Sequence, residues 1–124
     1  MKKIINTPNA PKPIGPYSQA VMYGNTLYVS GQIPVNPATG KFEPEIKAQT
    51  TQVMENLKAI LTEAGMDFSN VVKASIFISD MNNFAQINEV YGSYFTSDFP
   101  ARETVQVAKL PLAVDVEISV IAIK

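Results

Sequence analysis

The sequence predicts an α+β domain in which two helices pack on one face of a mixed β-sheet. Apolar residues recur at helical spacing in two stretches, which begin near residues 46 and 84. Short runs rich in β-branched residues lie before, between and after these stretches. The resulting order is β-β-β-α-β-α-β-β, which two helices on one side of a single sheet can satisfy. With 124 residues, the chain is expected to form one domain over residues 1–124.

An extended arm and a β-hairpin are predicted for the first third of the chain. Residues 7–16, TPNAPKPIGP, are too rich in proline to form a helix. Residues 17–23 alternate weakly between polar and apolar side chains, and Gly24-Asn25 is a turn signal. TLYVSG then continues as the second strand of the hairpin, and QIPVNPATGKFEP follows as a loop.

Two helices and three further strands are predicted for the rest of the chain. The first helix is indicated by a shared apolar face of Ile46, Val53, Leu57, Ile60, Leu61 and Ala64. Gly65 is the expected C-cap, and the strand VVKASIFIS begins at residue 71. Residues 80–83 offer N-caps for a second helix, whose apolar face carries Phe84, Ile87, Tyr91 and Phe95. The strands ETVQVA and VDVEISVIAI complete the sheet.

Apolar side chains occupy both alternating sets of the last strand. One set is Val116, Ile118 and Val120, and the other includes Ile121 and Ile123. Helices cover only one face of such a sheet, so a second copy of the chain is the expected cover for the other face. The low proportion of charged residues, 17%, is consistent with buried subunit surfaces, although a monomer with a polar, uncharged surface fits it equally well.

Charge and hydropathy exclude several classes of partner. The formal net charge is −1 and no basic run occurs, so binding to nucleic acid is not expected. No stretch reaches the roughly 20 apolar residues that a membrane span requires, so no membrane partner is expected. The opening MKKIINTPNAPKP lacks the apolar run of a signal peptide. We therefore expect a cytoplasmic protein.

The chain contains neither histidine nor cysteine. A Ser–His–Asp triad, a Cys–His pair, a disulfide and an ordinary zinc site are therefore excluded within it. Neither common glycine-rich phosphate motif occurs, and the acidic residues lack the spacing of a calcium loop. Any chemistry must come from Arg, Lys, acidic, hydroxyl, amide and backbone groups, or from water that they hold.

Arg102 is the only arginine, and it follows Pro100 at the start of a predicted strand. A guanidinium group can bind a carboxylate through two parallel hydrogen bonds, which a lysine cannot do. A surface ion pair with Asp98 or Glu103 is the alternative. The fixed approach through Pro100 favours a functional role.

Glu117 and Asn88 are further candidates. Glu117 lies on the less apolar face of the last strand, where partial burial would raise the pKa of its carboxyl group and allow proton transfer. Taken alone, Glu117 fits a solvated acid on an edge strand somewhat better. Asn88 lies on the apolar face of the second helix, where a buried hydrogen bond is the commoner role and a site amide the alternative.

The remaining candidates carry weaker signals. Tyr17 and Ser30-Gly31 lie at the edges of the first two strands, and a glycine there would let a ligand approach the backbone. Lys73 could form a Schiff base only if its pKa were lowered, and this role is not favoured. The aromatic residues of the second helix are interpreted as core, not as a platform for stacking nucleic-acid bases.

The segments IGPYSQAV, YVSGQIPVNPATG, FPARETVQVAKLP and VEISVIA closely resemble the reactive-intermediate deaminase family, also called the Rid (RidA) or YjgF family. The resemblance covers essentially the whole chain. It implies a chorismate-mutase-like fold that assembles as a homotrimer, with sites between adjacent subunits. It further implies hydrolysis of 2-imino acids and their enamine tautomers to 2-oxo acids and ammonia. Such imines are released by pyridoxal-phosphate enzymes such as threonine and serine dehydratases.

The same resemblance implies roles for individual residues. Arg102 would bind the substrate carboxylate, and Glu117 would act as the acid or hold the water. Tyr17, Ser30, Gly31 and Asn88 fall on positions that line the pocket of the family. Thr104 occupies a position where many members have cysteine; activity is expected to survive, while pocket size and substrate preference change. The reaction implied needs no metal, no cofactor and no covalent intermediate.

Two other functions remain open from the sequence. The intersubunit clefts could bind small 2-oxo acids as a sensor without turnover, which would need Arg102 but no carboxylate nearby. RNA cleavage or translation inhibition is attributed to some members of the family. The acidic pI of about 5.3 and the lack of histidine argue against it here.

Overall fold

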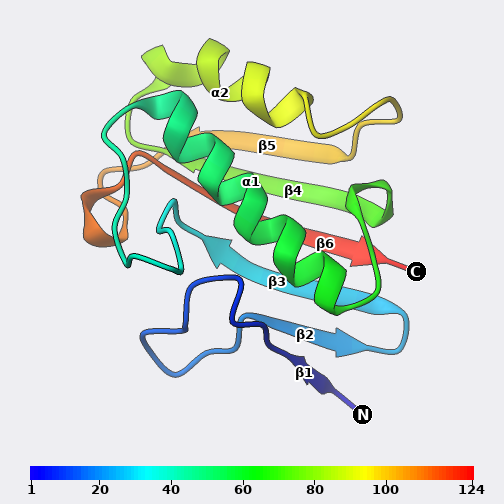
Figure 1. Ribbon diagram of the computed structural model, residues 1–124. Coiled ribbons are helices and arrows are strands. Elements are labelled where there is room, and N and C mark those ends of the chain that lie inside the picture. Colours follow the sequence, from blue (N-terminus) through cyan, green and yellow to red (C-terminus); the bar gives the residue numbers. More distant parts are fainter.

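The computed structural model describes residues 1–124 and shows one six-stranded sheet with both α-helices on the same face (Figure 1). The strands are β1 (Lys3–Ile5), β2 (Ala20–Tyr23), β3 (Thr26–Gln32), β4 (Val71–Ile78), β5 (Ala101–Gln106) and β6 (Val116–Ile123), and the helices are α1 (Ile46–Glu63) and α2 (Phe84–Gly92). Three short 3₁₀ turns span Phe68–Asn70, Met81–Asn83 and Pro111–Ala113. The predicted fold class and order of elements are confirmed.

The strand order in the sheet is β1-β2-β3-β6-β4-β5. Only β4 and β5 run parallel, and α2 forms the crossover between them. The other neighbouring strands are antiparallel, so the sheet is mixed as predicted. The C-terminal strand β6 therefore lies in the middle of the sheet, whereas β5 is an edge strand.

The hairpin of β2 and β3 forms as predicted, with Tyr23 opposite Thr26 and Gly24 at a φ of 60° in the turn. The strand β2 begins at Ala20, three residues later than the sequence pattern indicates. The preceding Gln19 side chain is instead buried, and it donates to the carbonyl groups of Thr7 (3.0 Å) and Pro11 (3.0 Å). This amide ties the proline-rich arm to the start of the strand.

The helix α1 buries its whole predicted apolar face against the sheet. Its N-terminus is capped by the Glu45 carboxylate, which accepts hydrogen bonds from the backbone of Lys47 (3.0 Å) and Ala48 (2.6 Å). Gly65 takes a φ of 73° just beyond the helix, as expected for a C-terminal glycine. Neither helix combines the length and the apolarity needed to cross a membrane.

The helix α2 ends at Gly92, so the prediction that it extends to Phe95 is wrong. The Ser93 hydroxyl donates to the Val90 carbonyl at 2.6 Å, a local bond that competes with the helical pattern. Phe95 still contacts Tyr91, with ring centres 5.0 Å apart. Its helical spacing thus reflects packing beyond the end of the helix.

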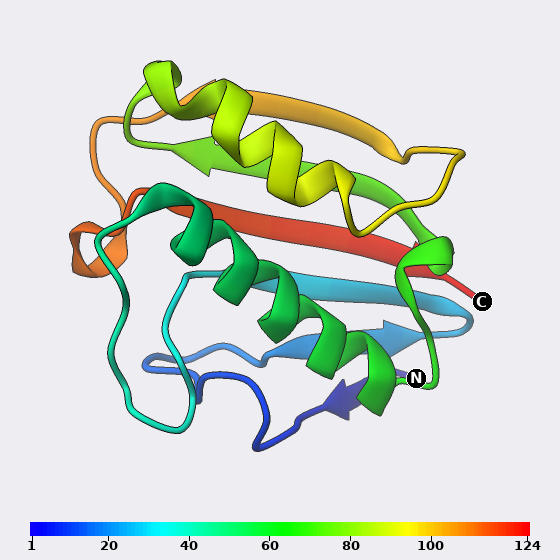
Figure 2. The same cartoon turned by 45° about the horizontal axis from the view of Figure 1, so that its top comes forward.

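One face of the sheet is left uncovered by the helices (Figure 2). In β6, residues 116, 118, 120 and 122 are buried beneath the helices, whereas residues 117, 119 and 121 alternate onto the other face. This open face also carries Tyr28, which pairs with Ile121 in β6 and is 52% exposed. Within one chain, therefore, the expected burial of both faces of β6 is not achieved.

Candidate active site

Arg102 lies on the helix-covered face of the edge strand β5. It pairs in parallel register with Ala74 of β4, which is fully buried beneath the helices. Its side chain accordingly runs under α2, and its Nη1 donates to the Asn88 Oδ1 at 2.7 Å. The two candidates Arg102 and Asn88 are thus brought into direct contact.

Two aromatic rings of α2 also hold the guanidinium group. The Arg102 Cζ lies 5.1 Å from the ring centre of Tyr91 and 5.6 Å from that of Phe84, within the range of cation–π attraction. The alternative ion pair is not formed, because Glu103 instead pairs with Lys73 at 3.1 Å. One of the five N–H donors of Arg102 is engaged with a side chain, so the others remain for a carboxylate ligand.

Two buried hydroxyl groups in this region have no hydrogen-bond partner. They belong to Thr104, which follows Arg102 on the same face of β5, and to Tyr91. Burial raises the pKa of the Tyr91 hydroxyl, and the charge of Arg102 partly opposes this shift, so the hydroxyl stays protonated. Such unpaired hydroxyls are uncommon, because buried polar groups are normally paired.

Glu117 lies on the opposite face of the sheet. In β6 it pairs with Phe77 of β4, and both side chains alternate away from the helices. A cavity of about 340 Å³ adjoins it, lined by Ile14, Tyr17, Ser30, Gly31, Ile33, Pro111 and Glu117. Burial raises the pKa of the Glu117 carboxyl group, as its half-buried position requires.

Gly31 creates the space that Glu117 occupies. The pairing of β3 with β6 shifts register between Val29 and Gln32, so the strand is irregular at Ser30-Gly31. A Cβ atom added at Gly31 would lie 2.8 Å from the Glu117 Cδ, closer than such atoms approach in proteins. The absence of a side chain at residue 31 therefore leaves room for the carboxyl group in this position.

Replacing Gly31 by alanine is expected to displace the Glu117 carboxyl group. Any reaction that depends on this group is then expected to slow at least about tenfold, because small displacements of reacting groups are costly. The measurement is kcat of the reaction that depends on Glu117, with circular dichroism to verify the fold. Gly92→Ala is the matched control, since a Cβ there meets no atom within 4 Å. Equal activity of the two variants would contradict this account of Gly31.

Tyr17 and Ser30 adjoin Glu117 from the arm and from β3. The Ser30 hydroxyl donates to the Ser18 carbonyl at 2.6 Å, which leaves its lone pairs free to accept a hydrogen bond. The Tyr17 hydroxyl lies 3.4 Å from the Ile14 backbone nitrogen, a long distance for a hydrogen bond, so it can turn towards a ligand.

The predicted site residues therefore form two separate groups in one chain. Arg102, Asn88 and Thr104 lie on the helix side of the sheet. Tyr17, Ser30, Gly31 and Glu117 line the cavity associated with the open face. The structure brings the members of each group together, but it does not bring Arg102 and Glu117 together.

Several lining residues were not singled out from the sequence. The sequence pattern predicts only a core role for Tyr91 and Phe84, although their spacing of three and four residues from Asn88 places them on the same side of α2. Pro111, Ile14 and Ile33 carry no local signal, because segments distant in the sequence bring them to Glu117. No three acidic side chains cluster in a way that could hold a metal ion.

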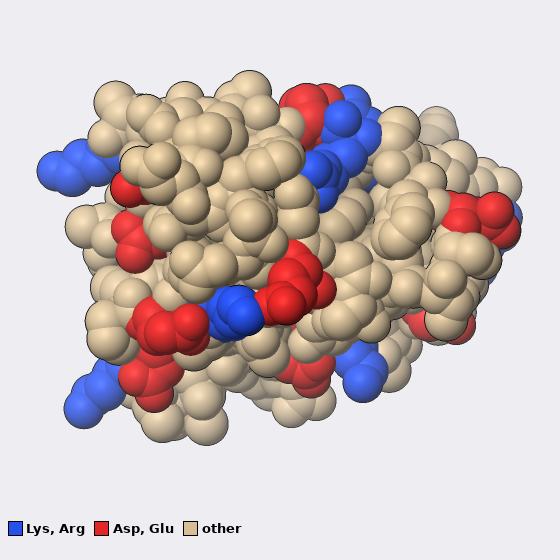
Figure 3. Space-filling view, turned by 90° about the horizontal axis from the view of Figure 1, so that it is seen from above, with Lys and Arg blue, Asp and Glu red and all other residues tan.

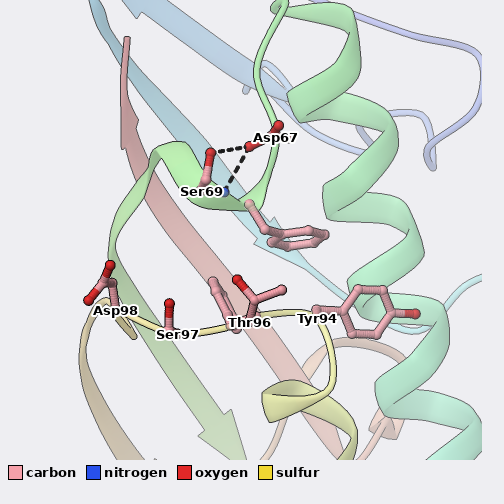
Figure 4. A pocket seen from close by; sticks show the side chains of 8 residues that line it. Asp67, Ser69, Tyr94, Thr96, Ser97 and Asp98 are labelled. Carbon is pink, nitrogen blue, oxygen red and sulfur yellow. Dashed lines mark hydrogen bonds between the residues drawn. The ribbon is translucent and has the colours of Figure 1, made fainter.

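A separate hollow of about 370 Å³ lies between the segment before β4 and the loop after α2 (Figure 4). Its polar groups already stabilise local structure. Asp67 accepts from the Ser69 backbone at 2.9 Å, and the Tyr94 hydroxyl donates to Glu55 at 2.7 Å. None of the predicted site residues lines this hollow, so we assign no chemistry to it.

Comparison with known proteins gives the class to which this fold and site belong. A family model described as Endoribonuclease L-PSP matches residues 7–124. The chain is 53% identical to a RutC family protein of Pyrococcus horikoshii, over 100% of this chain and 99% of that protein. It is 46% identical to the 2-iminobutanoate/2-iminopropanoate deaminase of Escherichia coli, over 100% of this chain and 99% of that enzyme.

A solved structure of Escherichia coli TdcF with bound serine has the same fold. It superposes with a TM-score of 0.96 at 45% identity, covering 98% of each chain. The chain therefore belongs to the YjgF/RidA family, as the sequence motifs predicted.

Proposed function

We propose that this protein hydrolyses reactive 2-imino acids, and their enamine tautomers, to 2-oxo acids and ammonia. The observation that carries the proposal is the lone arginine, which Asn88 and two aromatic rings hold with most of its donors free. The deaminase name of a relative 46% identical over the full chain supports the same reaction. The substrates proposed are 2-aminoacrylate, 2-iminobutanoate and 2-iminopropanoate.

Arg102 binds the substrate carboxylate in this proposal. Two aromatic rings and the Asn88 amide restrain the guanidinium group, so a planar carboxylate can meet two N–H groups with little further ordering of the side chain. The structure of TdcF with bound serine shows that a relative binds a small molecule with a carboxylate and a nitrogen on the adjacent carbon.

Glu117 supplies the proton chemistry. An enamine accepts a proton at its β-carbon and becomes an iminium ion, whose carbon is electrophilic. Water then adds to this carbon, and the resulting amino alcohol expels ammonia, so one C–O bond forms while one C–N bond breaks. A raised pKa keeps a larger fraction of the carboxyl group protonated and able to donate, and general acid–base catalysis contributes roughly 10²–10⁴-fold.

The complete site is proposed to join two copies of the chain. Arg102 and Glu117 lie on opposite faces of one sheet. A complete site therefore needs the Arg102 group of one copy to meet the Glu117 group of a neighbouring copy, and each group is half of the site. The open face exposes Tyr28 and Val105, an apolar surface of the kind that subunits cover. A homotrimer, which the resemblance implied, would form three such sites by closed rotational symmetry.

Direct measurement of imine hydrolysis tests the proposed reaction. A threonine dehydratase generates 2-aminoacrylate or 2-aminocrotonate from serine or threonine, and semicarbazide traps the imine that remains. The wild-type protein is expected to suppress semicarbazone formation while 2-oxo acid and ammonia still accumulate. Undiminished semicarbazone with several amino-acid precursors would rule out the deaminase.

Mixing two inactive variants tests whether the site joins two copies. The Arg102→Ala and Glu117→Gln variants are mixed in equal amounts, unfolded and then refolded together. Random assembly then pairs an intact arginine with an intact glutamate in roughly a quarter of the sites, so about that fraction of activity returns. Refolding each variant alone is the control. No recovery in the mixture would place both groups in one chain.

A binder or sensor of small 2-oxo acids at the same clefts is the second candidate. The geometry at Arg102 favours carboxylate binding whether or not turnover follows. Glu117 is the residue that distinguishes the two candidates, since a pure binder needs Arg102 but has no need of a carboxyl group near it. Tight binding of 2-oxobutanoate without imine hydrolysis would support the sensor.

RNA cleavage, which the description of the matching family model suggests, receives no support from the surface charge. Figure 3 shows the surface of the molecule from the side on which α2 and β5 lie. The basic side chains on it form small separate groups, and acidic side chains lie beside several of them. The Lys47–Glu89 and Lys73–Glu103 ion pairs further neutralise this region. Phosphate backbones are bound by continuous basic surfaces.

A further inference from the structure

We propose that Leu112 determines substrate specificity by forming an apolar wall for the side chain of the 2-imino acid. The protein would then favour imines with longer apolar side chains over the shortest ones. This inference rests on the proposed function and names the substrate class of the same site. It follows from the backbone at Leu112 and from the cavity that this residue lines.

The turn that carries Leu112 has an unusual backbone. Leu112 has a φ of 57° and a ψ of 16°, and the next residue, Ala113, also has a φ of 57°. The left-handed region is unfavourable for residues with a Cβ atom, and two successive residues in it are uncommon. Buried Leu110 and Val114 anchor the turn on either side. The fold therefore holds Leu112 in a conformation that a leucine would not adopt by itself.

This conformation gives one short turn a role in two adjoining cavities. Pro111 lines the cavity of Glu117, and Leu112 lines a second cavity of about 310 Å³. The two cavities share four lining residues, namely Ile14, Tyr17, Gly31 and Ile33. A substrate with its reacting carbon at Glu117 can therefore extend its side chain past Gly31 towards Leu112.

The second cavity is lined by apolar residues, by Lys12 and by amide side chains that each make at least one hydrogen bond within the chain. Gln32 donates to the Ser30 carbonyl at 3.1 Å, and the Asn36 Oδ1 accepts from the Ala38 backbone at 2.8 Å. The Gln19 amide is engaged with the arm. Leu112 itself is 59% exposed, so a substrate side chain would cover apolar surface that now faces water. The volume of this second cavity, about 310 Å³, lies at the lower end of the roughly 300–1,000 Å³ typical of small-molecule sites.

The test compares imines of different length. An L-amino-acid oxidase supplies them from alanine, 2-aminobutanoate, methionine and leucine, and kcat and KM are measured for the wild type and for Leu112→Ser. The variant is expected to lose about tenfold in kcat/KM for the leucine-derived imine, mainly through KM. The alanine-derived imine should be hydrolysed equally well by both proteins.

Ala113→Gly is the control for the backbone. It relieves the left-handed conformation next to Leu112 and leaves the leucine side chain in place. It should preserve the preference for long imines. If it alters the preference as much as Leu112→Ser does, or if Leu112→Ser alters nothing, the inference is overturned.

A binding measurement separates this inference from the proposed function. Calorimetry with 4-methyl-2-oxopentanoate and with pyruvate needs no turnover. The wild type is expected to bind the longer 2-oxo acid more tightly, and Leu112→Ser is expected to lose that difference. Hydrolysis of short imines without any chain-length preference would refute the role of Leu112 and leave the deaminase intact. A chain-length preference in binding without any hydrolysis would support the role of Leu112 and refute the deaminase.

Discussion

Arg102→Lys is expected to lower kcat/KM for 2-iminobutanoate at least about a hundredfold, which corresponds to roughly 2.7 kcal/mol. The variant keeps the positive charge but loses the two parallel hydrogen bonds to the substrate carboxylate. It also alters the contacts of the guanidinium group with the Tyr91 and Phe84 rings. Steady-state kinetics with the semicarbazide assay gives the value, and most of the loss should appear in KM if chemistry is slow.

Lys47→Ala is a matched control for Arg102→Lys. It removes an exposed cation that pairs with Glu89, and Lys47 neither contacts Arg102 nor lines the cavity of Glu117. Its activity should equal that of the wild type. Retention of more than a third of the wild-type kcat/KM by Arg102→Lys would show that a point charge is sufficient, contrary to the bidentate role.

Glu117→Gln is expected to lower kcat by about 10²–10⁴-fold while leaving KM nearly unchanged. Glutamine fills the same space beside Gly31 but cannot transfer a proton. Binding of a 2-oxo acid should survive, because Arg102 is intact. A variant that retains full kcat would exclude proton transfer by Glu117 and leave positioning of water as its only role.

The same substitution should reveal a pH-dependent gain in stability. Burial raises the pKa of Glu117 above its ordinary value of 4.5, so its contribution to stability is present at low pH and is lost as pH rises through the folded-state pKa. Glu117→Gln is therefore expected to have a higher Tm than the wild type at pH 7 and an equal Tm near pH 4. Calorimetry at both values decides this, and an equal Tm at pH 7 would contradict it.

Much of the fold could be predicted because its signals are local. The apolar face of α1, the turn at Gly24 and the terminal Gly65 each follow from residues a few positions apart. The length of α2 could not be predicted in the same way. Phe95 has helical spacing, but it packs on Tyr91 and Phe68 from the following loop, a contact that only the folded chain creates.

The candidate site was only partly predictable for a related reason. The sequence indicated Arg102 by its uniqueness and Glu117 by its place in an alternating strand. The face on which Arg102 lies depends on its register with Ala74, and no local pattern encodes that pairing. The left-handed backbone at Leu112 could not be predicted from the sequence either, because residues 112 and 113 are leucine and alanine, not the glycine or asparagine typical of this conformation.

The separation of Arg102 and Glu117 by the thickness of the sheet has a consequence for the timing of activity in a cell. No rotation of side chains within one chain can unite the two groups, so a newly synthesised chain would be latent under the proposed function. Turnover per chain would rise steeply as the protein concentration approaches the dissociation constant of the assembly. Near that threshold, halving the amount of protein would remove more than half of the imine-clearing capacity.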